Sequence, residues 1–434
     1  MNQIDVLIED NLKTMRAAPA LEYEAVLSIG SYQIKMMHVM ALSSREDYVR
    51  GQYEERMITV TMLPSEYAKL MLYGHADMTM RVTTITPSSQ SRIAKTYRAI
   101  PAMLRDPTLE NNSSQRVVQD QDNTNISVAH FQLMDPAAYD IRLRQIGTNF
   151  HKTRTIDIIK LIFGQTKLVD KYNQTEAVGA LQIDTDAVTT VPSQVIIPDG
   201  TNLITLPQFL QQEYGVYSQG IGCFLKNRTW YVFAPYSRKK ATYDIHKLIV
   251  INVPGDRYRK LDASYKVDGK TVTVMATGQA LHTDNTDADA MTGGTGVRQT
   301  DVTKLIHTPG KVDGTSKPAL NPQEYMREYQ SYEYNKNYIN APMDKNPHTA
   351  NPSVAASALA GRNGCYMEVV WERGVGEVLL PGMPVQFMTQ DGTKIKIMEG
   401  SLVGAEVLSS MTAPGLLEPT HHAMIKLTMF LRDK

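Results

Sequence analysis

Cysteine is almost absent from this chain. Only Cys223 and Cys365 occur among 434 residues, so a framework of several disulfides is excluded by arithmetic. We expect both to be small buried apolar side chains, with one bridge between them as the alternative. The sequence also lacks an apolar run long enough to cross a bilayer, and its first residues lack an apolar signal core. It therefore predicts neither a membrane-spanning segment nor a secretion signal.

An excess of charge of either sign is lacking too. Lys plus Arg and Asp plus Glu number 45 each, which makes the formal net charge zero. A dedicated nucleic-acid clamp usually carries a basic excess, because neutralised phosphates supply most of its affinity. The balance argues against such a clamp, although the short basic run Arg238–Lys240 leaves a local patch open. A run of this length is more often a solvated boundary between domains.

Common signatures of metal sites are missing as well. There is no His-Glu-x-x-His and no Cys-x-x-Cys. Adjacent histidines on a strand point to opposite faces, so His421 and His422 are not expected to hold one metal. We expect them at an exposed strand edge. Asp284, Asp287 and Asp289 lack the spacing and the closing glutamate of a calcium loop, and a solvated loop is the expectation there.

Phosphate-binding and catalytic signatures are equally scarce. Gly293–Gly296 is glycine-rich, but no strand precedes it and no Gly-Lys-Ser/Thr follows. The pair Glu54 and Glu55 supplies two carboxylates, whereas a glycosidase needs two that face each other across a cleft. No Gly-x-Ser-x-Gly elbow occurs. The sequence therefore predicts no catalytic, cofactor-binding or metal-ligating residue and no cofactor.

The segment 205–236 carries the clearest local pattern. Thr205 and Gln208 form the spacing of a helix capping box, and Gly215 is placed to end the helix. One apolar face follows at helical spacing, comprising Leu206, Phe209, Leu210 and Tyr214. Two strand-like runs come next, Ile221–Leu225 and Thr229–Phe233, on either side of the turn 226–228. The segment predicts a helix that leads at once into a β-hairpin, which is a scaffold element rather than a reactive one.

The rest of the chain is organised around alternating apolar and polar residues. We predict an α+β, mostly β fold, with two tube-like antiparallel β-barrel domains flanking a smaller α+β region. The expected parts are a leader at 1–20, a first barrel at 21–104, a middle region at 105–240 and a second barrel region at 241–434. The first barrel should carry one helix at Pro64–Tyr73, and the middle region a helix at Arg154–Leu168 capped by Thr155. A weak duplication, with the two β regions as copies of one barrel type, is compatible with this pattern.

The stretch 282–363 differs in kind. It is rich in Gly, Thr, Asp, Asn and Pro and lacks the apolar density needed to order itself alone. A long irregular insertion in a compact fold is usually functional or disordered. We expect it to dock a partner or to sheath a spike. The 23 methionines and 22 tyrosines suit a chain with extensive protein contacts, although general residue usage explains them equally well.

Three blocks together resemble the baseplate hub of tailed bacteriophages, which is related to the hub part of type VI secretion spikes. The first comprises LEYEAVLSIGSYQIKMMHVMAL and RMITVTMLPSEYAKLMLYGHADMTMRVTTI, the second is the segment 205–236, and the third is LLPGMPVQFMTQDGTKIKIMEGSLVGAEVLSS. The positions that match the family pattern are Leu206, Phe209, Leu210, Gly215, Trp230, Phe233, Pro381, Gly382 and Val385. The resemblance covers about three-quarters of the chain, and the 282–363 insertion departs from it.

The resemblance implies a mechanical role in a virion tail. Such hubs are homotrimers, in which two barrels per chain give six similar units that join a sixfold tail tube to a threefold central spike. It implies contacts with tube, spike and other baseplate proteins, passage of DNA without specific binding, and synthesis in the host cytoplasm. The alternatives are a tail-associated cell-wall hydrolase and a receptor-binding β protein. Host, type of tail and contacting surfaces stay open.

Overall fold

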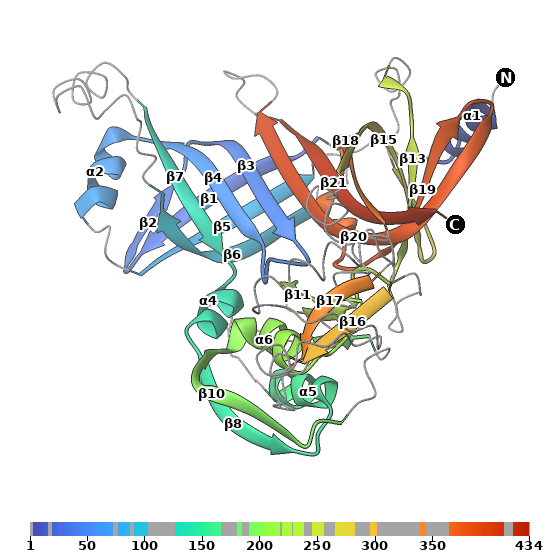
Figure 1. The fold of residues 1–434 in the computed structure, drawn as a ribbon. Coiled ribbons are helices and arrows are strands. Elements are labelled where there is room, and N and C mark those ends of the chain that lie inside the picture. The colour runs from blue at the N-terminus through green and yellow to red at the C-terminus, as the bar shows by residue number, and fades with distance from the viewer. Residues whose placement is uncertain are drawn as a thin grey trace, which may run out of the picture.

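The computed structural model places two β-barrels side by side, with a smaller region beneath their junction (Figure 1). The residues that it describes are 3–15, 20–72, 77–86, 91–102, 126–165, 180–184, 191–217, 219–227, 229–237, 245–255, 265–282, 296–301, 338–343, 364–411 and 420–433. The predicted fold class, mostly β with a small α+β part, is confirmed.

The strands of the first barrel lie between residues 22 and 134. Its strands are β1 (Glu22–Ile29), β2 (Tyr32–Lys35), β3 (His38–Asp47), β4 (Glu55–Met62), β5 (Met78–Thr86), β6 (Ser91–Pro101) and β7 (Ser127–Met134), with helix α2 at Pro64–Leu72. Strands β2 and β3 are two halves of one bent segment, of which β2 pairs with β1 and β3 pairs with β4. The ring therefore closes as β1, β2/β3, β4, β7, β6 and β5, and every pairing in it is antiparallel.

The second barrel uses the C-terminal part of the chain. Its strands are β13 (Lys247–Asn252), β15 (Thr271–His282), β18 (Cys365–Glu372), β19 (Pro384–Asp391), β20 (Lys394–Met411) and β21 (His421–Asp433), with β14 (Tyr265–Asp268) beside β15 and the short helix η4 at Gly376–Val378. The pairing of β19 with β20 closes this ring. The prediction of antiparallel barrels fails for one strand, since β13 runs parallel to both β15 and β19.

The two barrels share one topology. In chain order, strands one to six of each barrel pair as one–two, two–three, three–six, six–five, five–four and four–one. Strand two switches partners midway in both, and a register irregularity follows the switch, between Val39 and Ala41 in β3 and between Thr277 and Ala280 in β15. A helix separates strands three and four in each case. The duplication that the sequence allowed is thus visible in the order of strand pairing.

A continuous antiparallel sheet joins the barrels. Residues Gly404–Ser410 of β20 pair with Ala41–Asp47 of β3. One hydrogen-bonded wall of eight strands results, in the order β15, β18, β21, β20, β3, β4, β7, β6. One face of this wall packs into the two barrel cores, and the other face points outward. The two barrels are therefore connected directly by backbone hydrogen bonds and not only by the chain that links them.

The middle region lies beneath this junction. Its elements are α4 (Pro136–Arg142), β8 (Gln145–His151), α5 (Thr155–Gln165), β9 (Ala180–Ile183), β10 (Gln194–Asn202), η2 (Leu203–Thr205), α6 (Leu206–Glu213), β11 (Gly222–Lys226) and β12 (Thr229–Phe233). Strand β9 runs parallel to β12, and β10 pairs with β8. The predicted helix and hairpin are confirmed as α6, β11 and β12, and Gly215 ends the helix with a positive φ of 79°.

Two details of that segment were predicted wrongly. The capping box does not form, because η2 holds Thr205 in a helical backbone conformation and its hydroxyl donates to the Asn202 carbonyl. Phe209 lies at the rim of the middle core and is only partly buried, whereas Leu206 and Leu210 are fully buried. The predicted apolar face is therefore buried at Leu206 and Leu210 but not fully at Phe209.

Alternation explains why these segments become strands. In β1 the burial alternates along the strand, and Ala25, Leu27 and Ile29 point into the core while their neighbours are exposed or half-buried. Separate apolar clusters fill the first barrel, the second barrel and the middle region. The predicted leader contains helix α1 (Gln3–Leu12), which packs Ile4 and Ile8 onto the outside of the second barrel (Figure 1).

The four-part division of the chain remains a proposal. Strand β7 lies within the predicted middle region 105–240 but pairs with β4 and β6 of the first barrel. Of the insertion 282–363, the described part comprises residue 282 and the parallel pair β16 (Gly296–Asp301) and β17 (Tyr338–Met343). No helix in the described residues has the length and apolar character that a membrane span requires.

Candidate functional site

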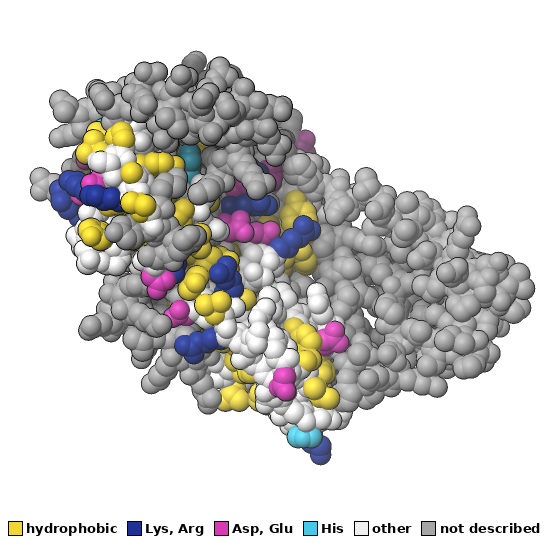
Figure 2. Space-filling model, turned by 90° about the vertical axis from the view of Figure 1, so that its left-hand side faces the viewer, with side chains coloured by type: hydrophobic (Ala, Val, Ile, Leu, Met, Phe, Trp, Pro, Cys, Tyr) yellow, Lys and Arg dark blue, Asp and Glu magenta, His cyan; other side chains and the backbone are white. Residues whose placement is uncertain are grey.

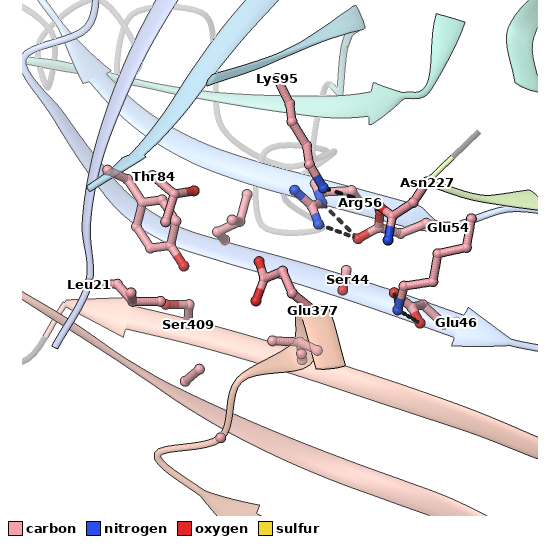
Figure 3. A pocket seen from close by; sticks show the side chains of 17 residues that line it. Leu21, Ser44, Glu46, Glu54, Arg56, Thr84, Lys95, Asn227, Glu377 and Ser409 are labelled. Carbon is pink, nitrogen blue, oxygen red and sulfur yellow. Dashed lines mark hydrogen bonds and ion pairs between the residues drawn. The ribbon is translucent and has the colours of Figure 1, made fainter. Parts of the chain in front are cut away.

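The two faces of the eight-stranded wall, at the place where the barrels join, form the candidate site. On the inner face a cavity of about 50 Å³ lies where both barrels meet the β11–β12 hairpin of the middle region (Figure 3). Polar and charged side chains from β3, β4, β6, β11 and η4 surround it. A space of this size holds a few waters at most and is too small for a metabolite.

A buried ion pair ties the hairpin to the wall. The Lys226 Nζ atom, at the end of β11, lies 2.6 and 2.8 Å from the two carboxylate oxygens of Glu46 on β3. Both residues are buried, with 8% and 4% of the side-chain surface exposed. The Tyr48 hydroxyl also donates to Glu46, and the Tyr48 amide donates to the Val403 carbonyl of β20. The Glu46 carboxylate therefore joins the middle region to the first barrel, and the Tyr48 backbone continues the contact to β20 of the second barrel.

A second ion pair lies beside the first. The Arg56 Nε donates to Glu54 at 2.8 Å, and its guanidinium donates to the Tyr97 hydroxyl at 2.6 Å. Burial alone would raise the pKa of Glu54, but the charges of Arg56 and Lys226 overcome it and hold that pKa below its ordinary value. Burial raises the pKa of the Tyr97 phenol, so the phenol stays neutral. Glu54 is thus an ionised carboxylate with a fixed partner.

This arrangement favours a structural lock over acid–base catalysis. A glycosidase acid needs a carboxyl whose pKa is raised, and Glu54 has the opposite shift. Glu46 is held by Lys226 and Tyr48. Glu377 reaches toward the cavity from η4 of the second barrel (Figure 3). Of the predicted pair, Glu54 lies at this site, whereas Glu55 begins β4 and is exposed.

His421 is also part of the junction, which corrects the expectation of an exposed edge. Strand β21 lies between β18 and β20, and His421 is fully buried. Its Nε2 lies 2.7 Å from the Val39 carbonyl and donates to it, and its ring meets Tyr23 edge-on at 5.0 Å. The His421 backbone pairs with Leu21. His422 is half-buried, and burial lowers its pKa.

The outward face of the wall carries a ladder of alternating charge across four strands. Arg45 on β3 lies 3.7 Å from Glu406 on β20, and Lys426 on β21 bridges Glu406 at 3.2 Å and Glu368 on β18 at 3.3 Å. Burial opposes the effect, but the two glutamates raise the pKa of Lys426. A hollow of about 340 Å³ opens beside the ladder, with Tyr236 and Tyr366 at its edge. The ladder contains two basic and two acidic side chains, so it adds no net charge to the wall.

Mixed charge is also seen on the side of the molecule formed by the first barrel and the middle region. Basic, acidic and apolar side chains are interspersed on that face (Figure 2). In the first barrel and the middle region, the apolar residues that expose half or more of their surface include Leu72, Val128 and Leu143. The local distribution thus follows the zero formal charge of the whole chain.

The other residues considered from the sequence do not gather at the junction. Cys223 and Cys365 do not form a disulfide. Cys223 is buried, which raises the pKa of its thiol, whereas Cys365 is only partly buried, so the expectation of two buried side chains is wrong for Cys365. Asp284, Asp287, Asp289 and Arg238–Lys240 lie outside the described residues. Within the described ranges, no three His, Cys, Asp or Glu side chains come together as a metal-ligand set. The buried pair of Lys226 and Glu46 was missed, because the partners are 180 residues apart and no local spacing signals them.

Comparison with solved structures finds similar folds. One is the prophage MuSo2 43 kDa tail protein from Shewanella oneidensis, with a TM-score of 0.46, 8% identity, and coverage of 95% of this chain and 100% of that chain. Another is the E. coli c3393 protein, a component of the type VI secretion system described as structurally similar to the T4 tail proteins gp27 and gp5. It has a TM-score of 0.42 and 9% identity, covering 94% of this chain and 76% of that chain. No protein-family model and no curated protein sequence matches the chain.

Proposed function

We propose that the chain is a structural component of a bacteriophage tail, the baseplate hub, which assembles as a trimer around a central channel. The observation that carries this proposal is the pair of barrels with one topology, joined through a continuous eight-stranded wall. Three such chains present six similar barrels in a ring. A ring of this kind has threefold symmetry in its chains and approximate sixfold symmetry in its barrels, and so fits a threefold spike on one side and a sixfold tube on the other.

The junction supports rigidity rather than turnover. Backbone pairing of β3 with β20 fixes the angle between the barrels, and the buried pair of Lys226 and Glu46 ties the middle region to the first barrel. An adaptor needs a fixed angle, because a small error in each chain accumulates around a closed ring. We propose that the protein has no catalytic activity and works through its shape, in contact with tube, spike and other baseplate proteins. Its place is the virion tail, after synthesis in the host cytoplasm.

The outward face of the wall suits the lining of a channel. DNA carries dense negative charge, and a basic lining would retain it through release of counterions. The ladder of Arg45, Glu406, Lys426 and Glu368 presents paired charges of both signs instead. DNA can slide past such a surface without being held. The proposal therefore includes transient passage of DNA with no specific binding.

Native mass spectrometry of the purified full-length chain tests the assembly directly. The proposal expects a species of three times the chain mass, formed alone or on addition of the spike partner. A chain that stays monomeric at high concentration with tube and spike proteins present would contradict it. A zymogram on peptidoglycan tests the hydrolase alternative, and clearing that is lost on Glu54→Gln while the fold is retained would favour that alternative.

A further inference from the structure

The two-stranded sheet of β8 and β10 lies at the end of the middle region that faces away from the barrels (Figure 1). On the outer edge of β10, the Tyr214 hydroxyl takes both backbone groups of Ile196. It accepts from the Ile196 amide at 2.9 Å and donates to the Ile196 carbonyl at 3.2 Å. Strand β8 pairs with β10 alone among the described strands. One edge of the sheet is therefore closed by a side chain, whereas the edge of β8 has no described strand beside it.

The register shows which backbone groups point to the open edge of β8. In an antiparallel pair, successive residues of a strand direct their N–H and C=O groups alternately to one side and to the other. Ile196 points away from β8, and its partner in the register is Asn149. Asn149 therefore points away from β10, and by alternation Gly147 and His151 do so too. Of these groups, the His151 carbonyl already accepts from the Thr153 hydroxyl at 2.9 Å, and the others face the open edge.

Basic side chains flank this open edge. The stretch 142–154, which contains β8, has no Asp or Glu, although the whole chain has no net charge. Its basic residues are Arg142, Arg144, Lys152 and Arg154. Arg154 is partnered by Asp157, whose carboxylate lies 2.7 Å from the Arg154 Nε. Arg144 and Lys152 are exposed at the two ends of β8, and neither forms an ion pair with a residue that the structure describes. The open edge therefore has an uncompensated positive charge at each end.

From these features we infer that the open edge of β8 binds an extended segment of a partner protein that carries a carboxylate at each end. In strand addition the backbone hydrogen bonds supply affinity, and side-chain contacts supply selectivity. Arg144 and Lys152 are eight positions apart in the sequence, so a matching strand carries acidic residues at about the same spacing. The site lies in the middle region and does not depend on how chains assemble into a ring.

Two other occupants fit the edge less well. Two copies of β8 paired antiparallel about Thr148 would bring Arg144 of each copy against Lys152 of the other, and like charges directly opposite repel. A nucleic acid would be attracted by the cations, but it offers no complementary strand to the N–H and C=O groups between them. Asp199 in the β10 bulge lies where a Cβ on Gly147 would point, so it covers a face of the sheet and not the edge. The basic flanks thus discourage self-association and attract an acidic strand.

Fluorescence anisotropy of a labelled peptide added to the full-length chain tests the pairing. The probe is the capped peptide Glu-Thr-Val-Thr-Val-Thr-Val-Thr-Glu, whose two carboxylates have the spacing of the basic flanks. The control is the same peptide with Lys in place of both Glu. At low salt the acidic peptide should bind, and the basic peptide should bind at least about tenfold more weakly.

Variants of the chain separate backbone pairing from charge. Asn149→Pro removes one N–H from the open edge and leaves the pairing with β10 in place, since proline is tolerated where the amide faces solvent. It should weaken binding of the acidic peptide at least about tenfold. Lys152→Glu should weaken the same binding about three- to tenfold. The matched control Lys394→Glu, at an exposed position that begins β20 in the second barrel, should leave it unchanged.

Hydrogen exchange on the unaltered chain locates the contact independently of any variant. The acidic peptide should slow exchange of the Asn149 amide and leave that of Phe150, which faces β10, unchanged. No binding up to about 1 mM peptide, or binding that survives Asn149→Pro, would overturn the inference. Binding of duplex DNA in place of the peptide, lost on Lys152→Glu, would also overturn it and assign the flanks to phosphate. None of these results bears on the proposed trimer, which native mass spectrometry tests separately.

Discussion

Removal of the Lys226 amino group is the sharpest test of whether the buried ion pair between Lys226 and Glu46 stabilises the junction. In the variant Lys226→Met the aliphatic stem is retained, but the Glu46 carboxylate loses its counter-charge in a place where 4% of its surface is exposed. Breaking a buried ion pair on one side costs about 3–5 kcal/mol, because the remaining charge is left without compensation. The Tyr48 hydroxyl still donates to Glu46, so we expect a loss at the lower end, about 3 kcal/mol.

Urea unfolding monitored by tryptophan fluorescence measures this loss. Trp371 reports the core of the second barrel and Trp230 the core of the middle region, and both are buried. The double variant Lys226→Met with Glu46→Gln removes both charges, and its stability should return to within about 1–2 kcal/mol of the unaltered chain. The difference between single and double variants gives the coupling between the two side chains.

An exposed ion pair provides the matched control. Arg45 and Glu406 lie 3.7 Å apart with 67% and 46% of their side chains exposed. We expect Arg45→Met to cost less than about 1 kcal/mol, as exposed pairs do. If Lys226→Met costs no more than this control, or if the double variant is no more stable than the single one, Lys226 and Glu46 do not lock the junction.

Three further outcomes follow from individual side chains. Leu210→Ala should cost about 2–5 kcal/mol because Leu210 is fully buried, whereas Phe209→Ala should cost roughly 1–2 kcal/mol in the same unfolding assay. Gly400→Ala should lower the free energy of unfolding by at least about 3 kcal/mol, because the new Cβ would lie 1.7 Å from the Phe430 carbonyl oxygen. Gly164→Ala, which has open space around it in α5, should raise the free energy of unfolding by about 0.5–1 kcal/mol, and thermal melting measures both changes. The pKa of Glu54 is lowered in the folded chain, so on acidification the unfolded chain binds a proton at this residue before the folded chain does. Stability should therefore fall as the pH drops below about 4.3, and the Glu54→Gln variant should lack this part of the acid-induced loss of stability.

Much of the fold was predictable because barrel strands have one face in the core and one in solvent. The alternation in β1 and the turn after Lys226 are local signals, and both led to correct elements. The capping box was not predictable, since its failure depends on the preceding turn η2 and on how it sets the backbone of Thr205. The local sequence pattern predicts the helices and strands, while the backbone conformation at their ends depends on the segments that precede them.

The site could be anticipated much less well. Glu46 is one charge in the run Arg45–Asp47, and nothing in that run tells which side chain is buried. The pairing of β3 with β20 determines which side chain is buried, because Glu46 then points to the cavity and Arg45 to the outward face. For His421 the sequence suggested an edge, yet β20 and β18 flank its strand on both sides. Residues that meet across hundreds of positions are defined by topology, which the alternation alone does not encode.

Electron cryomicroscopy of the assembled protein, viewed down its symmetry axis, tests the central claim most directly. The account predicts threefold particles with six similar barrel densities around one open channel. Particles with a different number of barrels, without threefold symmetry, or without an open channel would contradict it.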